Sequence, residues 1–143
     1  MKGGVIALTP AALAALISGV GCHGGGSPEE ALEAYNGAMA AKDFAGAAHT
    51  VYCESWGGYD AGELAKAREA YGRELEGSYE LSNLDYGRAE IVRRDRVAND
   101  LVRLLVNYKR RSAGAPAAAY EMHFKLINGS WYYYVPTTLA PTK

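Results

Sequence analysis

The chain has 143 residues, enough for one domain, and 49% of them are hydrophobic, so a buried core is expected and disorder is not. The formal net charge of −1 lacks the basic excess of a nucleic-acid-binding protein. Residues 22–77 contain four basic and ten acidic residues, whereas residues 78–143 contain ten basic and six acidic ones. We interpret these two parts as solvated faces of opposite sign.

The chain begins with a pattern typical of an export signal. Lys2 is followed by an uncharged apolar run over residues 5–20, and small residues precede Cys22. We therefore predict a signal peptide over residues 1–21 and a glycine-rich flexible tether over residues 22–27. The predicted domain covers residues 28–137, and a short tail covers residues 138–143.

This start resembles that of bacterial lipoproteins, in which cleavage leaves a cysteine at the new N-terminus and its thiol carries the lipid. Cys22 is the matching residue, although Gly19 stands where that family prefers leucine. The resemblance implies a lipid anchor on a cell-envelope membrane, facing the periplasm or the cell exterior. Two alternatives stay open: a soluble secreted protein, and an uncleaved anchor whose apolar run is shorter than the about 20 residues of a typical span.

The chain has two cysteines, Cys22 and Cys53. Lipidation of Cys22 leaves Cys53 as a lone buried thiol, whereas export without a lipid permits a disulfide between them. The two outcomes exclude each other. Because no CxxC motif is present, we predict neither a zinc site nor a thioredoxin-like redox site, and no cofactor.

Start signals predict three helices after the tether. Ser27 is the N-cap of the first helix, with Pro28 at its first position and Glu30 completing a capping box. Asp43 begins a short second helix, on which His49 and Cys53 stand four residues apart. An adjacent imidazole and thiol at this spacing can form an activated thiolate, but we favour a structural histidine and a buried cysteine.

The third helix begins after Asp60, which forms a capping box with Glu63. Its buried stripe is predicted from apolar residues at helical spacing, namely Leu64, Ala67, Tyr71 and Leu75. After Gly77 the apolar period changes toward two, which indicates strands. The first predicted strand covers residues 79–94, with a bulge or bend between Leu81 and Leu84.

The second half of the chain predicts further antiparallel strands. Residues 101–110 are predicted to form a strand whose inward positions are Val102, Leu104, Val106 and Tyr108. The alternative is a helix, because helical spacing also fits Val97, Leu101, Leu104 and Tyr108. Asn128 and Gly129 are the strongest hairpin signal, and a two-residue turn there places Leu126 opposite Trp131 and Phe124 opposite Tyr133. The basic residues at 93–96 and 109–111 are interpreted as hairpin ends that discourage edge pairing.

Three helices followed by about four antiparallel strands predict an α+β fold with the N-terminal helices packed on one face of a curved sheet. This layout resembles the nuclear-transport-factor-2-like (cystatin-like) superfold, in particular small bacterial lipoproteins with such a domain. The resemblance rests on the segments Pro28-Glu29-Glu30-Ala31, Ala41-Lys42-Asp43-Phe44 and residues 124–132 (FKLINGSWY). It implies a cone-shaped pocket closed by the helices. Some members of this superfold are isomerases or cyclases, and many are non-catalytic binders.

Aromatic residues supply the predicted binding surface. The candidate pocket residues are Tyr35, Tyr71, Tyr108, Tyr120, Trp131 and Tyr133, whose hydroxyl and ring groups would suit a small amphipathic ligand. An outer sheet face containing Leu101, Leu105, Ile127, Tyr132 and Tyr134 is predicted to contact an envelope protein or a second copy of the chain.

We predict no catalytic and no metal-ligating residue. Acid–base chemistry needs a titratable group in the pocket, and the predicted inward strand positions contain no Asp, Glu or His. Asp85 would face inward only if the predicted bulge placed it there. The sequence therefore favours a non-catalytic ligand-binding or protein-interaction domain. The alternative is a small pocket enzyme of the isomerase or hydratase type.

Overall fold

The computed structural model describes residues 25–137, so the predicted signal peptide, Cys22 and the C-terminal tail lie outside the described residues. The helices are α2 (Pro28–Ala40), α3 (Phe44–His49) and α4 (Ala61–Ser82), with a short 3-10 helix η1 (Glu54–Trp56). The strands are β1 (Val51–Cys53), β2 (Leu84–Ala98), β3 (Leu101–Arg110), β4 (Ala118–Ile127) and β5 (Ser130–Val135). No described helix is both long enough and apolar enough to cross a membrane.

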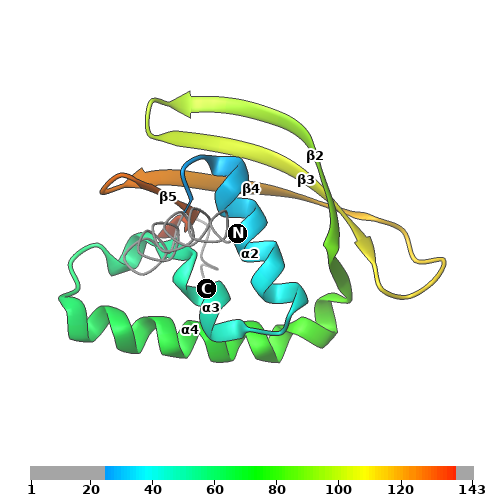
Figure 1. Cartoon of the computed structure of the whole chain (residues 1–143), viewed down its shortest axis with the longest axis horizontal. Coiled ribbons are helices and arrows are strands. Elements are labelled where there is room, and N and C mark those ends of the chain that lie inside the picture. Colours follow the sequence, from blue (N-terminus) through cyan, green and yellow to red (C-terminus); the bar gives the residue numbers. More distant parts are fainter. Residues whose placement is uncertain (1–24, 138–143) are drawn as a thin grey trace, which may run out of the picture.

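The elements form an α+β fold, as predicted, with the helices on one side of a single sheet (Figure 1). The strand order is β1-β5-β4-β3-β2. The pairs β2–β3, β3–β4 and β4–β5 are antiparallel, whereas β1 pairs with β5 in parallel. The prediction of about four antiparallel strands is therefore corrected to five strands in a mixed sheet. Residues 51–53, expected in the second helix, form β1 instead, because apolar residues in a short buried strand have the same pattern as those on a helix face.

The C-terminal hairpin has the predicted register. Leu126 pairs with Trp131 and Phe124 pairs with Tyr133. The turn residues Asn128 and Gly129 have φ angles of 51° and 86°, the left-handed region that a two-residue hairpin turn requires. Strand β3 also has its predicted bounds, and its four predicted inward residues are buried.

The helix starts are fixed by the predicted capping residues. Ser27 Oγ accepts from Glu30 N at 3.1 Å, and Asp43 Oδ1 accepts from Gly46 N at 2.9 Å. The predicted capping box of α2 is only half formed, because Glu30 Oε1 accepts from Gly26 N and not from Ser27 N. At α4, Asp60 and Glu63 form a complete capping box. These bonds satisfy backbone donors that have no partner within the first turn of a helix.

The end of α4 differs from the prediction, because the helix continues to Ser82 and residues 79–82 are not part of a strand. Asn83 ends the helix in the left-handed conformation, with φ of 57°. Arg110 Nη1 donates to Ser82 O at 2.9 Å, and Arg111 Nη2 donates to Tyr79 O at 3.0 Å. These arginines, predicted only to protect a sheet edge, supply donors for the last carbonyls of the helix.

The hydrophobic core lies between the helices and the inner face of the sheet. Helix α2 packs on β2 and β5, and α3 contacts both α2 and α4. Leu104, Val106 and Phe124 are fully buried at its centre. Gly25 also pairs with Trp131 through two backbone hydrogen bonds, so the predicted tether is joined to β5 at this residue.

Candidate ligand-binding site

Aromatic side chains line a partly open cavity of about 180 Å³ beside the end of α4. We call it the tyrosine cavity, and its lining residues are Tyr35, Ser82, Leu84, Tyr86, Tyr108, Tyr120, Met122 and Tyr133. Helix α2 supplies the first of these residues, the end of α4 the second, and strands β2 to β5 the rest. Because alternate strand residues face the same side, residues 84 and 86 of β2 reach the cavity together.

Edge-to-face contacts hold these rings. The ring centroids of Tyr35 and Tyr133 are 5.2 Å apart, and those of Tyr86 and Tyr108 are 5.5 Å apart, both at steep interplanar angles. Each such pair contributes about 0.5–1.5 kcal/mol beyond burial of its area. The cavity wall is therefore an interlocked set of rings.

One buried hydrogen bond fixes the position of the cavity wall against α2. Tyr108 Oη donates to Asn36 Oδ1 at 2.7 Å, and the two residues are 2% and 8% exposed. The Tyr108 hydroxyl also lies 3.6 Å from the sulfur of Met122. Asn36 was not among the predicted site residues, because its helix position gives no signal for a partner on β3.

Burial sets the protonation of the tyrosine hydroxyls. Desolvation raises the pKa of Tyr133 to about 12, and it raises the pKa of Tyr35 well above its ordinary value. The pKa of Tyr108 is also raised by desolvation, and the hydrogen bond to Asn36 lowers it by less. These hydroxyls are neutral at pH 7, and those of Tyr35 and Tyr133 can donate hydrogen bonds to a ligand, whereas Tyr108 already donates its hydrogen to Asn36.

Four of the six predicted pocket residues line this cavity, namely Tyr35, Tyr108, Tyr120 and Tyr133. Tyr120 is 41% exposed, so it borders the cavity from a solvent-exposed position. The other two predicted residues lie elsewhere. The ring of Tyr71 packs edge-on against Trp56 at 5.9 Å, and Trp131 pairs with Gly25 through its backbone.

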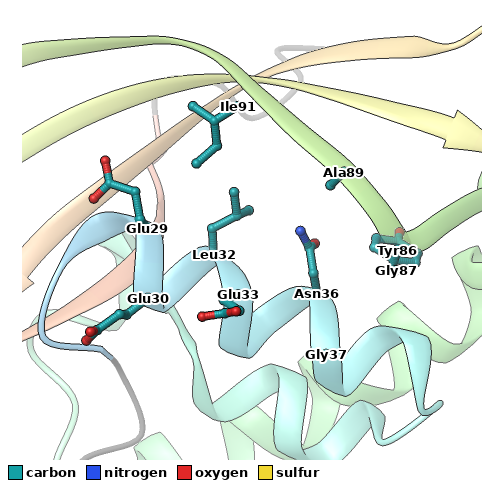
Figure 2. Close-up of a pocket in the computed structure, with 10 residues that line it drawn as sticks. All are labelled: Glu29, Glu30, Leu32, Glu33, Asn36, Gly37, Tyr86, Gly87, Ala89 and Ile91. Atoms are coloured by element: carbon teal, nitrogen blue, oxygen red, sulfur yellow. The ribbon is translucent and has the colours of Figure 1, made fainter.

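A larger groove lies between α2 and β2, with a volume of about 520 Å³ (Figure 2). Leu32, Ala89 and Ile91 give it an apolar surface, and three glutamates of α2 line it as well. Figure 2 shows the amide nitrogen of Asn36 directed into this groove, and Tyr86 lines both the groove and the tyrosine cavity. The sequence pattern gave no indication of the groove, because it depends on how α2 crosses the sheet.

The expected pairing of His49 and Cys53 on one helix is wrong. His49 is the last residue of α3, whereas Cys53 is the last residue of β1. Cys53 is buried, and desolvation raises the pKa of its thiol to about 11. An activated thiolate requires the opposite shift of the pKa.

Asp85 does not reach the tyrosine cavity. Its Oδ2 lies 3.6 Å from Arg88 Nε, and its Oδ1 accepts from Gly87 N at 3.2 Å. The predicted bulge between Leu81 and Leu84 is wrong, because α4 continues to Ser82; the register shift in the pairing of β2 with β3 lies between Leu84 and Ala89. Asp85 nevertheless lies between two residues that face the cavity, and its own side chain lines a different hollow.

The outer face of the sheet combines apolar and charged residues. The five apolar residues predicted there are all half-buried, namely Leu101, Leu105, Ile127, Tyr132 and Tyr134. Asp95 accepts from Arg93 at 3.0 Å and from Arg103 at 3.3 Å, and these arginines hold the pKa of its carboxyl below the usual value. Contact of this face with an envelope protein or a second copy stays a prediction.

Within residues 25–137, no group of three or more His, Cys, Asp and Glu side chains is placed to hold a metal ion. No protein-family model matches the sequence, and no curated protein matches it. Among solved structures, the chain is similar to the solution structure of a SEC-C motif containing protein from Rhodopseudomonas palustris. The two share 18% sequence identity, 76% of each chain is covered, and the TM-score is 0.48.

Proposed function

We propose that the protein is a non-catalytic binding protein whose tyrosine cavity takes a small amphipathic ligand. The observation that supports this proposal is the convergence of five tyrosines and Met122 on one hollow. Their rings offer apolar contact, and their neutral hydroxyls offer hydrogen bonds. No Asp, Glu or His contributes to the lining of this cavity, and catalysis is not part of the proposal.

The size of the cavity limits the ligand. A volume of about 180 Å³ suits a molecule of roughly one aromatic ring, since a cavity of about 150 Å³ holds benzene. A hydroxyl or carbonyl oxygen on the ligand would accept from a tyrosine hydroxyl. The expected ligand is therefore an uncharged ring-sized compound with one oxygen substituent.

We further propose that the domain is attached to the cell envelope through lipidated Cys22. The lipoprotein-like N-terminal sequence that ends at Cys22 supports this part. Intact mass of the protein from its own host tests it. A chain that begins at Cys22 with added acyl mass is the expected result, and a chain without acyl mass would contradict the anchor.

Phenol is a suitable probe for the cavity. In the full chain labelled at its methionine methyl groups, phenol should shift the NMR signal of Met122, which lines the cavity. The signal of Met39, which is fully buried on α2 and does not line the cavity, serves as an internal reference. Leu84→Phe places extra volume in the cavity and should weaken phenol binding, whereas Tyr71→Phe should leave it unchanged.

An unshifted Met122 signal at millimolar phenol would refute the proposed ligand class. Equal binding by the wild-type chain and Leu84→Phe would place phenol outside the cavity. Circular dichroism of each variant shows whether it remains folded, so a loss of binding is not confused with unfolding.

A further inference from the structure

Four cationic side chains line one hollow of about 410 Å³, where β2 begins and β3 ends. We call it the basic hollow, and its cationic residues are Arg88, Lys109, Arg110 and Arg111. The loop that follows β3, including Ser112 and Gly114, lines the same hollow. In a chain with a net charge of −1, this is a local concentration of positive charge.

Backbone acceptors hold two of these arginines in place without removing their formal charge. Arg110 Nε donates to Pro116 O at 3.0 Å and its Nη1 donates to Ser82 O at 2.9 Å. Arg111 lies 4.3 Å from the ring centroid of Tyr79, and its Nη2 donates to the carbonyl of that residue. Both guanidinium groups are therefore fixed before a ligand arrives, which lowers the entropy cost of binding.

Few carboxylates oppose this charge. Asp85 is the acidic residue that lines the hollow, and it pairs with Arg88 at 3.6 Å. Glu80 is largely exposed and lies 3.4 Å from Arg111. Ser112 Oγ accepts from Asn83 Nδ2 at 2.8 Å, so its own hydroxyl hydrogen is left to donate.

We propose that the basic hollow binds a phosphate-bearing anion. A phosphate group carries several strong acceptor oxygens, and arginine and lysine are the side chains that recognise it in proteins. Arg88, Lys109 and the Ser112 hydroxyl supply donors, while Arg110 and Arg111 supply fixed positive charge. The phosphate can belong to a free ion or to an anionic lipid headgroup, and the experiment distinguishes these sources.

The basic hollow is separate from the tyrosine cavity. Leu84 and Tyr86 line the cavity, whereas Asp85 between them lines the hollow. The two sites share no lining residue, although Arg110 Nη1 donates to the carbonyl of Ser82, which lines the cavity. A ligand in the cavity is therefore not needed to complete the lining of the hollow.

The test uses the full chain labelled with ¹⁵N and titrated with inorganic phosphate at constant ionic strength. We expect saturable shifts of the amide signals of Lys109, Ser112 and Gly114. Lys109→Ala and Arg88→Ala should each weaken binding by about two- to fivefold, which corresponds to the loss of one exposed charge contact. Lys66→Ala removes an exposed lysine of α4 that lies outside the hollow, and it should bind like the wild type.

A second arm uses sedimentation with vesicles of phosphatidylcholine, with or without phosphatidylglycerol, and all chains carry Cys22→Ser. Binding that requires phosphatidylglycerol and weakens in Lys109→Ala and Arg88→Ala supports a lipid phosphate as the source. Binding of inorganic phosphate with no such vesicle effect supports a free phosphate. The proposal is overturned if neither probe binds, or if the hollow variants bind like Lys66→Ala.

Discussion

The hydrogen bond between Tyr108 and Asn36 should be a principal stabilising contact of the candidate site. Both residues are buried, and Tyr108 Oη lies 2.7 Å from Asn36 Oδ1. Tyr108→Phe retains the ring and removes the donor, so the carboxamide oxygen of Asn36 loses its partner. An unsatisfied buried acceptor costs about 1–3 kcal/mol. We expect a loss of about 2 kcal/mol in the free energy of unfolding, and a Tm lower by roughly 8 °C.

Urea unfolding followed by circular dichroism measures this loss. Tyr120→Phe is the matched control, because Tyr120 touches the same cavity but is 41% exposed, and its variant should differ from wild type by less than about 0.5 kcal/mol. A double-mutant cycle with Asn36→Ala should give a coupling energy of about 1 kcal/mol. Equal midpoints for Tyr108→Phe and Tyr120→Phe, together with no coupling, would refute the role assigned to the bond.

Three further predictions concern other parts of the fold. Stability should fall as the pH rises above about 9, because burial raises the Cys53 pKa from 9.0 to about 11 and the folded thiol keeps its proton longer than the unfolded one. In Cys53→Ala the urea midpoint should change less with pH than in the wild type between about pH 9 and 10, a range below the ordinary tyrosine pKa of 10.0. An equal change of the midpoint with pH in both chains would contradict the raised pKa of Cys53. Gly129→Ala should cost about 1 kcal/mol or more, because φ is 86°, and a neutral result in calorimetry would argue against the turn. Asp60→Ala should cost about 1 kcal/mol through loss of the α4 cap, whereas Asp60→Asn should retain most of that stability in the same urea assay.

The sequence predicted the features that depend on neighbouring residues. The caps Ser27, Asp43 and Asp60 could be predicted because each binds a backbone N–H only three residues further along the chain. The hairpin register could be predicted because it follows from the two-residue turn at Asn128 and Gly129. Four of the six pocket residues were found because strand alternation and helix spacing placed them on inward faces.

Features that depend on distant residues were not predicted. Strand β1 is defined by its parallel pairing with β5, whose residues are far away in the chain. The end of α4 at Ser82 depends on Asn83 and on donors from the end of β3, and a change in apolar period gives no signal of either. The roles of Asn36 and the α2–β2 groove likewise depend on tertiary packing.

The position of β5 has a consequence for how the chain is made. This strand lies between β4 and β1, and its Trp131 also holds Gly25. During synthesis on the ribosome, Gly25 and β1 cannot form their hydrogen bonds to β5 until that strand has emerged. A nascent chain that stops before Ser130 can form its helices and the β2–β3–β4 meander, but two early segments still lack their partners. Completion of this fold therefore follows the synthesis of β5.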